Sequence, residues 1–114
     1  MNEPFEPARR RIVAAARGLA EVSEGTSYGT PALKVGRKML ARLKDPDTVV
    51  LPCAMEDKAM LIEAAPDIYY ETDHYRGWPL VLARLAVIGD DELAHRLAIA
   101  WRLQATPRML KARG

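Results

Sequence analysis

The sequence predicts an α+β fold, a two-layer sandwich in which helices pack on one face of an antiparallel β-meander. Near both ends of the chain, apolar residues recur every three or four positions, which is typical of amphipathic helices. Between them, short runs that alternate apolar and polar residues are separated by turns rich in Gly, Pro and Asp, which is typical of consecutive antiparallel strands. The 114 residues, 49% of them hydrophobic, are expected to form a single domain, residues 1–114.

The first helix is expected over residues 5–19. The apolar residues that share its inner face are Phe5, Ala8, Ile12, Ala15, Ala16 and Leu19. Pro7 suits the first turn, where a missing N–H removes no helical hydrogen bond. Gly18 lowers helix stability by about 1 kcal/mol relative to alanine. The helix is therefore expected to end near Gly18.

A short edge strand is expected next, over residues 22–28. Residues 28–31 are expected to form a turn or bulge rather than a regular ladder, because Pro31 favours an extended conformation at the residue before it. Further along, Pro46 lies between two aspartates, a composition that favours a turn. This turn would lead into another strand over residues 48–51.

A hairpin with two different faces is predicted between these segments. Residues 32–35 and 38–44 flank Gly36 and Arg37, a spacing that predicts a tight two-residue turn. Because side chains alternate along a strand, one face is expected to be apolar and to face the core. Its residues would be Leu33, Val35, Met39, Ala41 and Leu43. The opposite face would carry Lys34, Lys38, Leu40, Arg42 and Lys44.

The second half of the chain is expected to contain two helices, two strands and a loop. These are a helix at residues 55–65, a β-like run at 68–71, a loop at 73–79, a buried strand at 80–86, and a helix from an N-cap at Asp90 to about Gln104. On the first of these helices, Met55, Ala59 and Ile62 are expected to face inward. Its charged residues, including Lys58, are expected mostly outside, and Met39, Met55 and Met60 are attributed to core packing.

No enzymatic, metal-binding or nucleotide-binding motif is present in the sequence. His74, His95 and Cys53 do not form a zinc-binding spacing, and no glycine fingerprint for phosphate occurs. We therefore expect a non-enzymatic protein without a metal or cofactor, and an enzyme built on the loop that contains Asp73 and His74 is the less favoured alternative. The longest apolar run is shorter than the roughly 20 residues that a spanning helix needs. With no signal peptide and one cysteine, a cytoplasmic location without membrane association or an internal disulfide is expected.

A basic stretch is the main functional lead. The net charge is only +2, but residues 31–44 contain five basic residues and no acidic one. The hypothesis is weak, mostly non-specific binding of DNA through phosphate contacts. The candidate residues are Lys34, Lys38, Arg42 and Lys44, with Arg76 and Arg84 at the rim and Tyr75 to stack on bases. A solvated face, or neutralisation by the acidic residues 45–73, is the alternative.

A pocket for a small anionic molecule is the second hypothesis. The residues expected to line it are Tyr28, Thr30, His74, Tyr75, Arg76 and Trp78. Aromatic rings and hydrogen-bonding groups in one loop favour ligand contact. The alternatives are a structural loop histidine at His74 and a packed loop in which Trp78 anchors the following strand. The sequence leaves protein partners open.

Three segments resemble the MmcQ/YjbR family in the order in which that family has them. They are GLAEVSEGTSYGTPALKVGRKMLARLK, HYRGWPLVLARLAVIGDDEL and AWRLQATPRML. Leu33 and Leu40 stand where the family more often has phenylalanine. The resemblance implies an α+β fold similar to the frataxin-like sandwich, with β-hairpins described as a double wing around Gly36 and Pro46. It also implies a DNA-binding protein, a family label based on analogy of fold.

Overall fold

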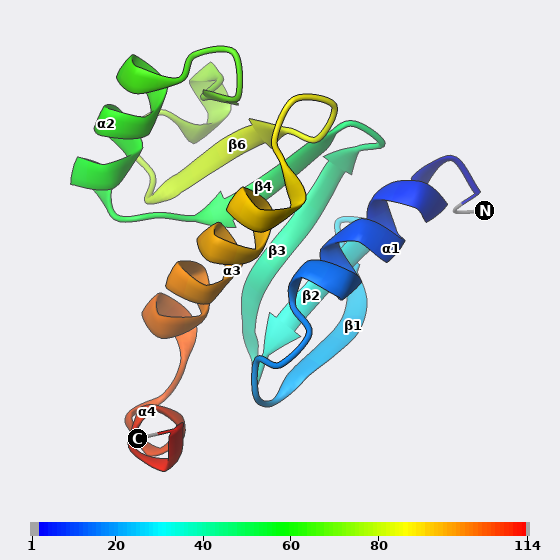
Figure 1. Ribbon diagram of the computed structural model, residues 1–114, viewed down its shortest axis with the longest axis vertical. Coiled ribbons are helices and arrows are strands. Elements are labelled where there is room, and N and C mark those ends of the chain that lie inside the picture. The colour runs from blue at the N-terminus through cyan, green and yellow to red at the C-terminus, as the bar shows by residue number, and fades with distance from the viewer. Residues whose placement is uncertain (1–2, 114) are drawn as a thin grey trace.

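A six-stranded antiparallel sheet forms one layer of the computed structural model, which describes residues 3–113 (Figure 1). Its strand order is β1-β2-β3-β4-β6-β5. The strands are β1 (Val22–Ser27), β2 (Thr30–Val35), β3 (Lys38–Asp45), β4 (Thr48–Pro52), β5 (Tyr69–Tyr70) and β6 (Leu80–Arg84). The predicted α+β class is confirmed. Residues 28–31 are more regular than predicted, because only Tyr28 and Gly29 form the turn and Pro31 pairs with Thr26.

Two helices form the second layer on one face of this sheet. α1 (Glu6–Ala15) and α3 (Asp90–Gln104) contact each other and cross strands β2, β3 and β4 (Figure 1). The other helices are η1 (Glu3–Phe5), α2 (Met55–Ala64), η2 (Asp73–Tyr75) and α4 (Pro107–Arg113). Among residues 3–113, no helix has the length and apolar character needed to span a membrane.

The ends of the C-terminal helices differ from the prediction. Gly89 is the N-cap of α3, so Asp90 is its first helical residue. Pro107 does lie beyond α3, but it also begins α4, which was not predicted. The Thr106 hydroxyl accepts a hydrogen bond from the Met109 backbone N–H at 3.2 Å. A Thr-Pro pair at this position thus forms a helix start, since proline at the first helical position loses no hydrogen bond.

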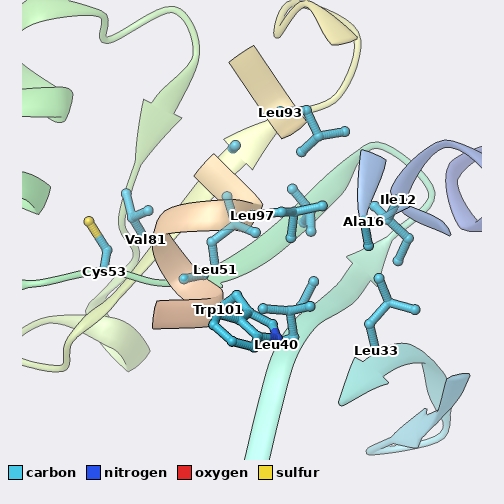
Figure 2. Packing of buried hydrophobic residues seen from close by; sticks show 14 of the residues in the cluster. Ile12, Ala16, Leu33, Leu40, Leu51, Cys53, Val81, Leu93, Leu97 and Trp101 are labelled. Atoms are coloured by element: carbon cyan, nitrogen blue, oxygen red, sulfur yellow. The ribbon is translucent and has the colours of Figure 1, made fainter. Parts of the chain in front are cut away.

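The hydrophobic core lies between the sheet and helices α1 and α3 (Figure 2). Leu97 and Trp101 of α3 pack toward the sheet, and the Trp101 indole N–H donates to the Ala20 carbonyl at 2.8 Å. Tyr69 is buried in the same core, and its hydroxyl donates to the Glu92 carboxylate. Burial, together with that hydrogen bond, raises the pKa of Tyr69 above its ordinary value.

A β-bulge in β3 overturns part of the predicted alternation. Leu33 pairs with Ala41, but the next residue of β2, Lys34, pairs with Met39, so Leu40 is an extra residue in β3. Leu40 and Ala41 therefore both lie in the core, whereas Met39 packs with the cluster on the opposite face. The predictions that Met39 faces the core and that Leu40 lies on the basic face are wrong. Lys38 does not share the face of Arg42 as predicted either, because it pairs with the core residue Val35. Leu33, Val35, Ala41 and Leu43 are in the core as predicted.

Helix α2 is oriented differently from the prediction. Lys58, expected outside, is 3% exposed, while Met55 and Met60, attributed to the core, are 47% and 58% exposed. Ala59 is exposed as well. Helical spacing places Met55, Ala59 and Ile62 on one side, but only Ile62 packs against the core. Lys58 is buried because a loop packs over it and supplies the acceptors for its hydrogen bonds.

Candidate binding site on the outer face of the sheet

The face of the sheet opposite α1 and α3, here called the outer face, carries a mixed row of side chains. Neighbouring strands place Arg42 opposite Val50, Val50 opposite Leu82, and Leu82 opposite Tyr70. Val50 and Leu82 form a small apolar cluster with Tyr75, separate from the main core. Alternation along β3 and β4 thus brings one arginine next to apolar and aromatic groups.

A hollow of about 510 Å³ opens between the β1–β2 turn and the loop at 71–79. We call it the outer hollow. Its lining residues are Ser27, Tyr28, Met39, Arg42, Val50, His74, Tyr75, Trp78 and Leu80. Strands supply most of the apolar residues, and the turn and the loop supply the aromatic ones. The hollow is in the size range of small-molecule sites, which combine apolar walls with a few polar groups.

Arg42 is the cation of this hollow. It is half-buried, donates a hydrogen bond to the Tyr75 hydroxyl, and lies 5.3 Å from the ring centroid of Tyr28. Arg9, Arg11 and Lys58 each form an ion pair with a carboxylate. For Arg42, no ion pair with a carboxylate occurs within the part of the chain that the structure describes. Partial burial of a charge without a counter-ion is unfavourable, so this guanidinium is suited to receive an anion.

Tyr28 sits at the tip of the β1–β2 hairpin in a conformation that tyrosine rarely adopts. Ser27 pairs with Thr30, so Tyr28 and Gly29 form a two-residue turn, with φ values of +54° and +80°. Such turns favour Asn-Gly, because a left-handed conformation costs most residues about 1–2 kcal/mol. Tyr28 is also 91% exposed. Tyr28 thus combines a strained backbone with an exposed ring beside Arg42, and it has no evident role in stability.

Trp78 forms the rim on the other side of the outer hollow. It is 60% exposed and follows Gly77, whose φ of +82° favours glycine. The indole therefore does not anchor the following strand in the core, which corrects that alternative from the sequence. The start of β6 is held by the backbone instead, since the Cys53 N–H donates to the Pro79 carbonyl at 3.0 Å.

The residues predicted to contact DNA are dispersed. Lys38 and Lys44 are exposed, and Lys34 is half-buried on β2 beside Met39. Arg76 forms an ion pair with Asp73 at 2.8 Å. Of the predicted set, only Arg42 and Tyr75 line the outer hollow.

Two further members of that set have structural partners. Arg84 stacks over Tyr70 at 4.1 Å from the ring centroid and donates to the carbonyl oxygens of Pro66 and Asp67. Tyr75 is 6% exposed, and its ring meets His74 edge to face at 4.8 Å. A buried ring cannot stack on a base, so the predicted stacking role does not fit Tyr75.

The residues predicted to line a ligand pocket come together more closely. Tyr28, His74, Tyr75 and Trp78 all line the outer hollow. Thr30 does not, and its hydroxyl instead donates to the Ser27 carbonyl at 3.0 Å within the hairpin. Arg76 lies outside the lining as well. Sequence reasoning missed Met39 as a lining residue because the bulge at Leu40 could not be seen.

Comparison with known proteins places the chain in a family. The YjbR family model matches residues 17–103. Uncharacterized protein Rv2570 of Mycobacterium tuberculosis and Uncharacterized protein Mb2600 of Mycobacterium bovis are each 31% identical over 91 residues, which covers 75% of this chain and 70% of each relative. No solved structure gives a significant match. Since the family model covers more than half of the 114 residues, the chain belongs to the YjbR family, as the resemblance predicted.

Proposed function

We propose that this protein is a non-enzymatic binding protein whose outer hollow takes an anionic molecule with a flat ring. The observation that carries the proposal is the position of Arg42. It is a half-buried guanidinium without a carboxylate partner among the described residues, and it lies in a hollow rimmed by two exposed aromatic side chains. A cytoplasmic location is part of this proposal.

The chemistry of the hollow favours one negative charge and an apolar body. One NH₂ group of the Arg42 guanidinium donates to the Tyr75 hydroxyl. The other N–H groups can donate to a carboxylate or to two oxygens of one phosphate group. Met39, Val50 and Leu80 offer apolar contact below the aromatic rims of Tyr28 and Trp78. Within residues 3–113, the hydrogen bonds of the lining side chains do not join a nucleophile to a base.

A pair of probes that differ only in charge tests the proposal. We expect 2-naphthoate to bind in isothermal titration calorimetry and the neutral 2-naphthylmethanol to bind at least about tenfold more weakly, the size of one charge-assisted hydrogen bond. Arg42→Met should abolish this difference. Arg102→Met, the same change at an exposed position of α3, is the matched control and should leave it intact. Equal affinity for both probes would contradict the proposal.

Nucleic acid is the second candidate ligand, and the exposure of Tyr28 and Trp78 favours it. Exposed rings beside cations stack on unpaired bases while basic groups contact phosphates. Lys34, the cross-strand partner of Met39, extends the positive charge from Arg42 toward the β2–β3 turn. Binding of DNA would then be weak, mostly non-specific and stronger for single strands than for duplex.

Fluorescence anisotropy with labelled oligo-dT and a labelled duplex at low salt tests this candidate. We expect binding of oligo-dT to weaken with salt, because phosphate contacts release counterions. It should also weaken in an Arg42→Ala, Lys44→Ala double variant and be displaced by 2-naphthoate. No binding at low salt, or binding unchanged in the double variant, would exclude nucleic acid at this site.

A further inference from the structure

We infer that Lys58 is the positioning residue of the outer hollow, a buried ammonium group that sets one wall of the hollow without lining it. The inference rests on the proposed function, because it concerns the shape of the same site. Lys58 belongs to α2 and is 3% exposed. The wall in question is the loop at 71–79, which supplies His74, Tyr75 and Trp78 to the lining.

The contacts of Lys58 account for all three of its N–H donors. Its Nζ donates to the carbonyl oxygens of Tyr75 and Trp78, both at 2.9 Å, and lies 2.7 Å from Oε1 of Glu71. An ammonium group has three donors and no acceptor. The two carbonyls belong to residues that line the outer hollow, so the lysine holds the loop at the backbone positions that direct those side chains.

Other hydrogen bonds hold the loop less completely. The Tyr75 N–H donates to the Thr72 carbonyl at 2.9 Å and the Trp78 N–H to the Tyr75 carbonyl at 3.0 Å, but both bonds lie within the loop. The Cys53 N–H fixes the loop to the segment after β4 only at its last residue, through the Pro79 carbonyl at 3.0 Å. Beneath the loop, Arg42 reaches the Tyr75 hydroxyl. Lys58 ties the loop to a helix, and a buried carbonyl that loses its donor is unfavourable. Without Lys58 the loop is expected to move away from α2.

Arg11 provides a matched control elsewhere in the molecule. It donates to the carbonyl oxygens of Leu85 and Ile88 and pairs with Asp90 at 2.7 Å. It therefore holds the loop before α3 in the same way, through two carbonyls and one carboxylate, but it does not line the outer hollow. Loss of Arg11 should reduce stability without changing the site.

Trp78 makes the positioning measurable without any ligand. The chain has two tryptophans, and Trp101 is fully buried. Acrylamide should quench mainly Trp78, and a Trp78→Phe variant identifies its signal. In Lys58→Met, we expect a larger fast component in the time-resolved anisotropy of Trp78. We also expect the affinity for 2-naphthoate to fall by about tenfold or more, because the charge-assisted hydrogen bonds from Lys58 to the loop are lost. In Arg11→Met, both should stay within about twofold of the wild type.

A second variant keeps the test valid if Lys58→Met does not fold. Lys58→Gln retains a donor for the carbonyls but loses the charge, and it should give a smaller loosening in the same direction. The inference is overturned if neither Lys58 variant changes Trp78 anisotropy, or if Arg11→Met changes it equally. If Trp78 loosens only in the Lys58 variants while wild-type protein binds no 2-naphthoate, the positioning role is supported and the proposed function is wrong.

Discussion

The two faces of the sheet are built from alternate residues of the same strands, yet they differ in how completely their groups are satisfied. On the core face, Leu40 and Leu43 are fully buried beneath α3, and Trp101 has a hydrogen-bond partner for its indole. On the outer face, Tyr28 is strained and Arg42 has no carboxylate partner among the described residues. Strained or unsatisfied groups often occur at functional sites. We therefore expect stability to depend mainly on the core face, and we propose ligand contact for the outer face.

The two tryptophans give the sharpest test of this contrast. Trp101→Ala should lower the free energy of unfolding by about 3–5 kcal/mol, because it leaves a large cavity in the core. Trp78→Ala should change it by less than about 0.5 kcal/mol, as for other exposed positions, while weakening 2-naphthoate binding. Urea denaturation and calorimetry measure the two effects. Comparable destabilisation by both substitutions would break the comparison.

The neighbours Leu40 and Met39 test whether the bulge divides the faces. Leu40→Ala should cost about 2–5 kcal/mol, because the side chain is fully buried. Met39→Ala should cost about 1 kcal/mol, since its side chain is only partly buried on the outer face. Equilibrium denaturation of both variants gives the difference. If Met39→Ala costs more than Leu40→Ala, the bulge has been assigned to the wrong residue.

Alkaline pH should lower the free energy of unfolding through the titration of Tyr69, a residue of the core face. The folded state raises the pKa of Tyr69, whereas the unfolded chain loses that proton near pH 10. Above about pH 10 the unfolded state binds fewer protons than the folded state. The contribution of Tyr69 to the free energy of unfolding is therefore complete below about pH 10 and falls as the pH rises further. Tyr69→Phe should flatten the fall in denaturation curves between pH 9 and 11. Tyr28→Phe, at an exposed position, is the control and should retain the fall of the wild type.

The smallest expected effect is a gain in stability. Tyr28→Asn should stabilise the protein by about 1 kcal/mol, because asparagine tolerates the left-handed conformation of this turn. The same substitution removes an aromatic rim and should weaken 2-naphthoate binding. A higher stability in thermal denaturation together with a lower 2-naphthoate affinity in calorimetry would strengthen the contrast between the two faces. A loss of stability would show that Tyr28 contributes to the fold.

Much of the fold could be predicted from local patterns. Helical spacing identified α1, α2 and α3, and period-two alternation with turn residues identified the meander, because both signals are repeated over many residues. The bulge at Leu40 escaped prediction, since one extra residue reverses the alternation without a glycine or proline to mark it. Resemblance to a family supported the fold and was later confirmed.

The site was less predictable because it depends on contacts between distant segments. Tyr28, His74, Tyr75 and Trp78 were expected to converge from their chemistry, and they do line one hollow. Lys58 was expected outside because lysine usually is, and its acceptors lie 17 and 20 residues away in the loop. Whether Arg42 has a carboxylate partner among the described residues depends on where the acidic residues of distant segments lie, and no local pattern describes those positions.

The position of β1 at the edge of the sheet has a consequence for the rate of binding. β1 is the edge strand and pairs with β2, so the turn that carries Tyr28 belongs to an edge hairpin, whereas the opposite wall of the outer hollow is tied to α2. Loops and turns move on nanosecond to microsecond timescales. We expect the tip of this hairpin to open and close many times during the lifetime of a complex. Diffusion, rather than a slow conformational gate, would then limit association, and the lifetime of the complex would set its affinity.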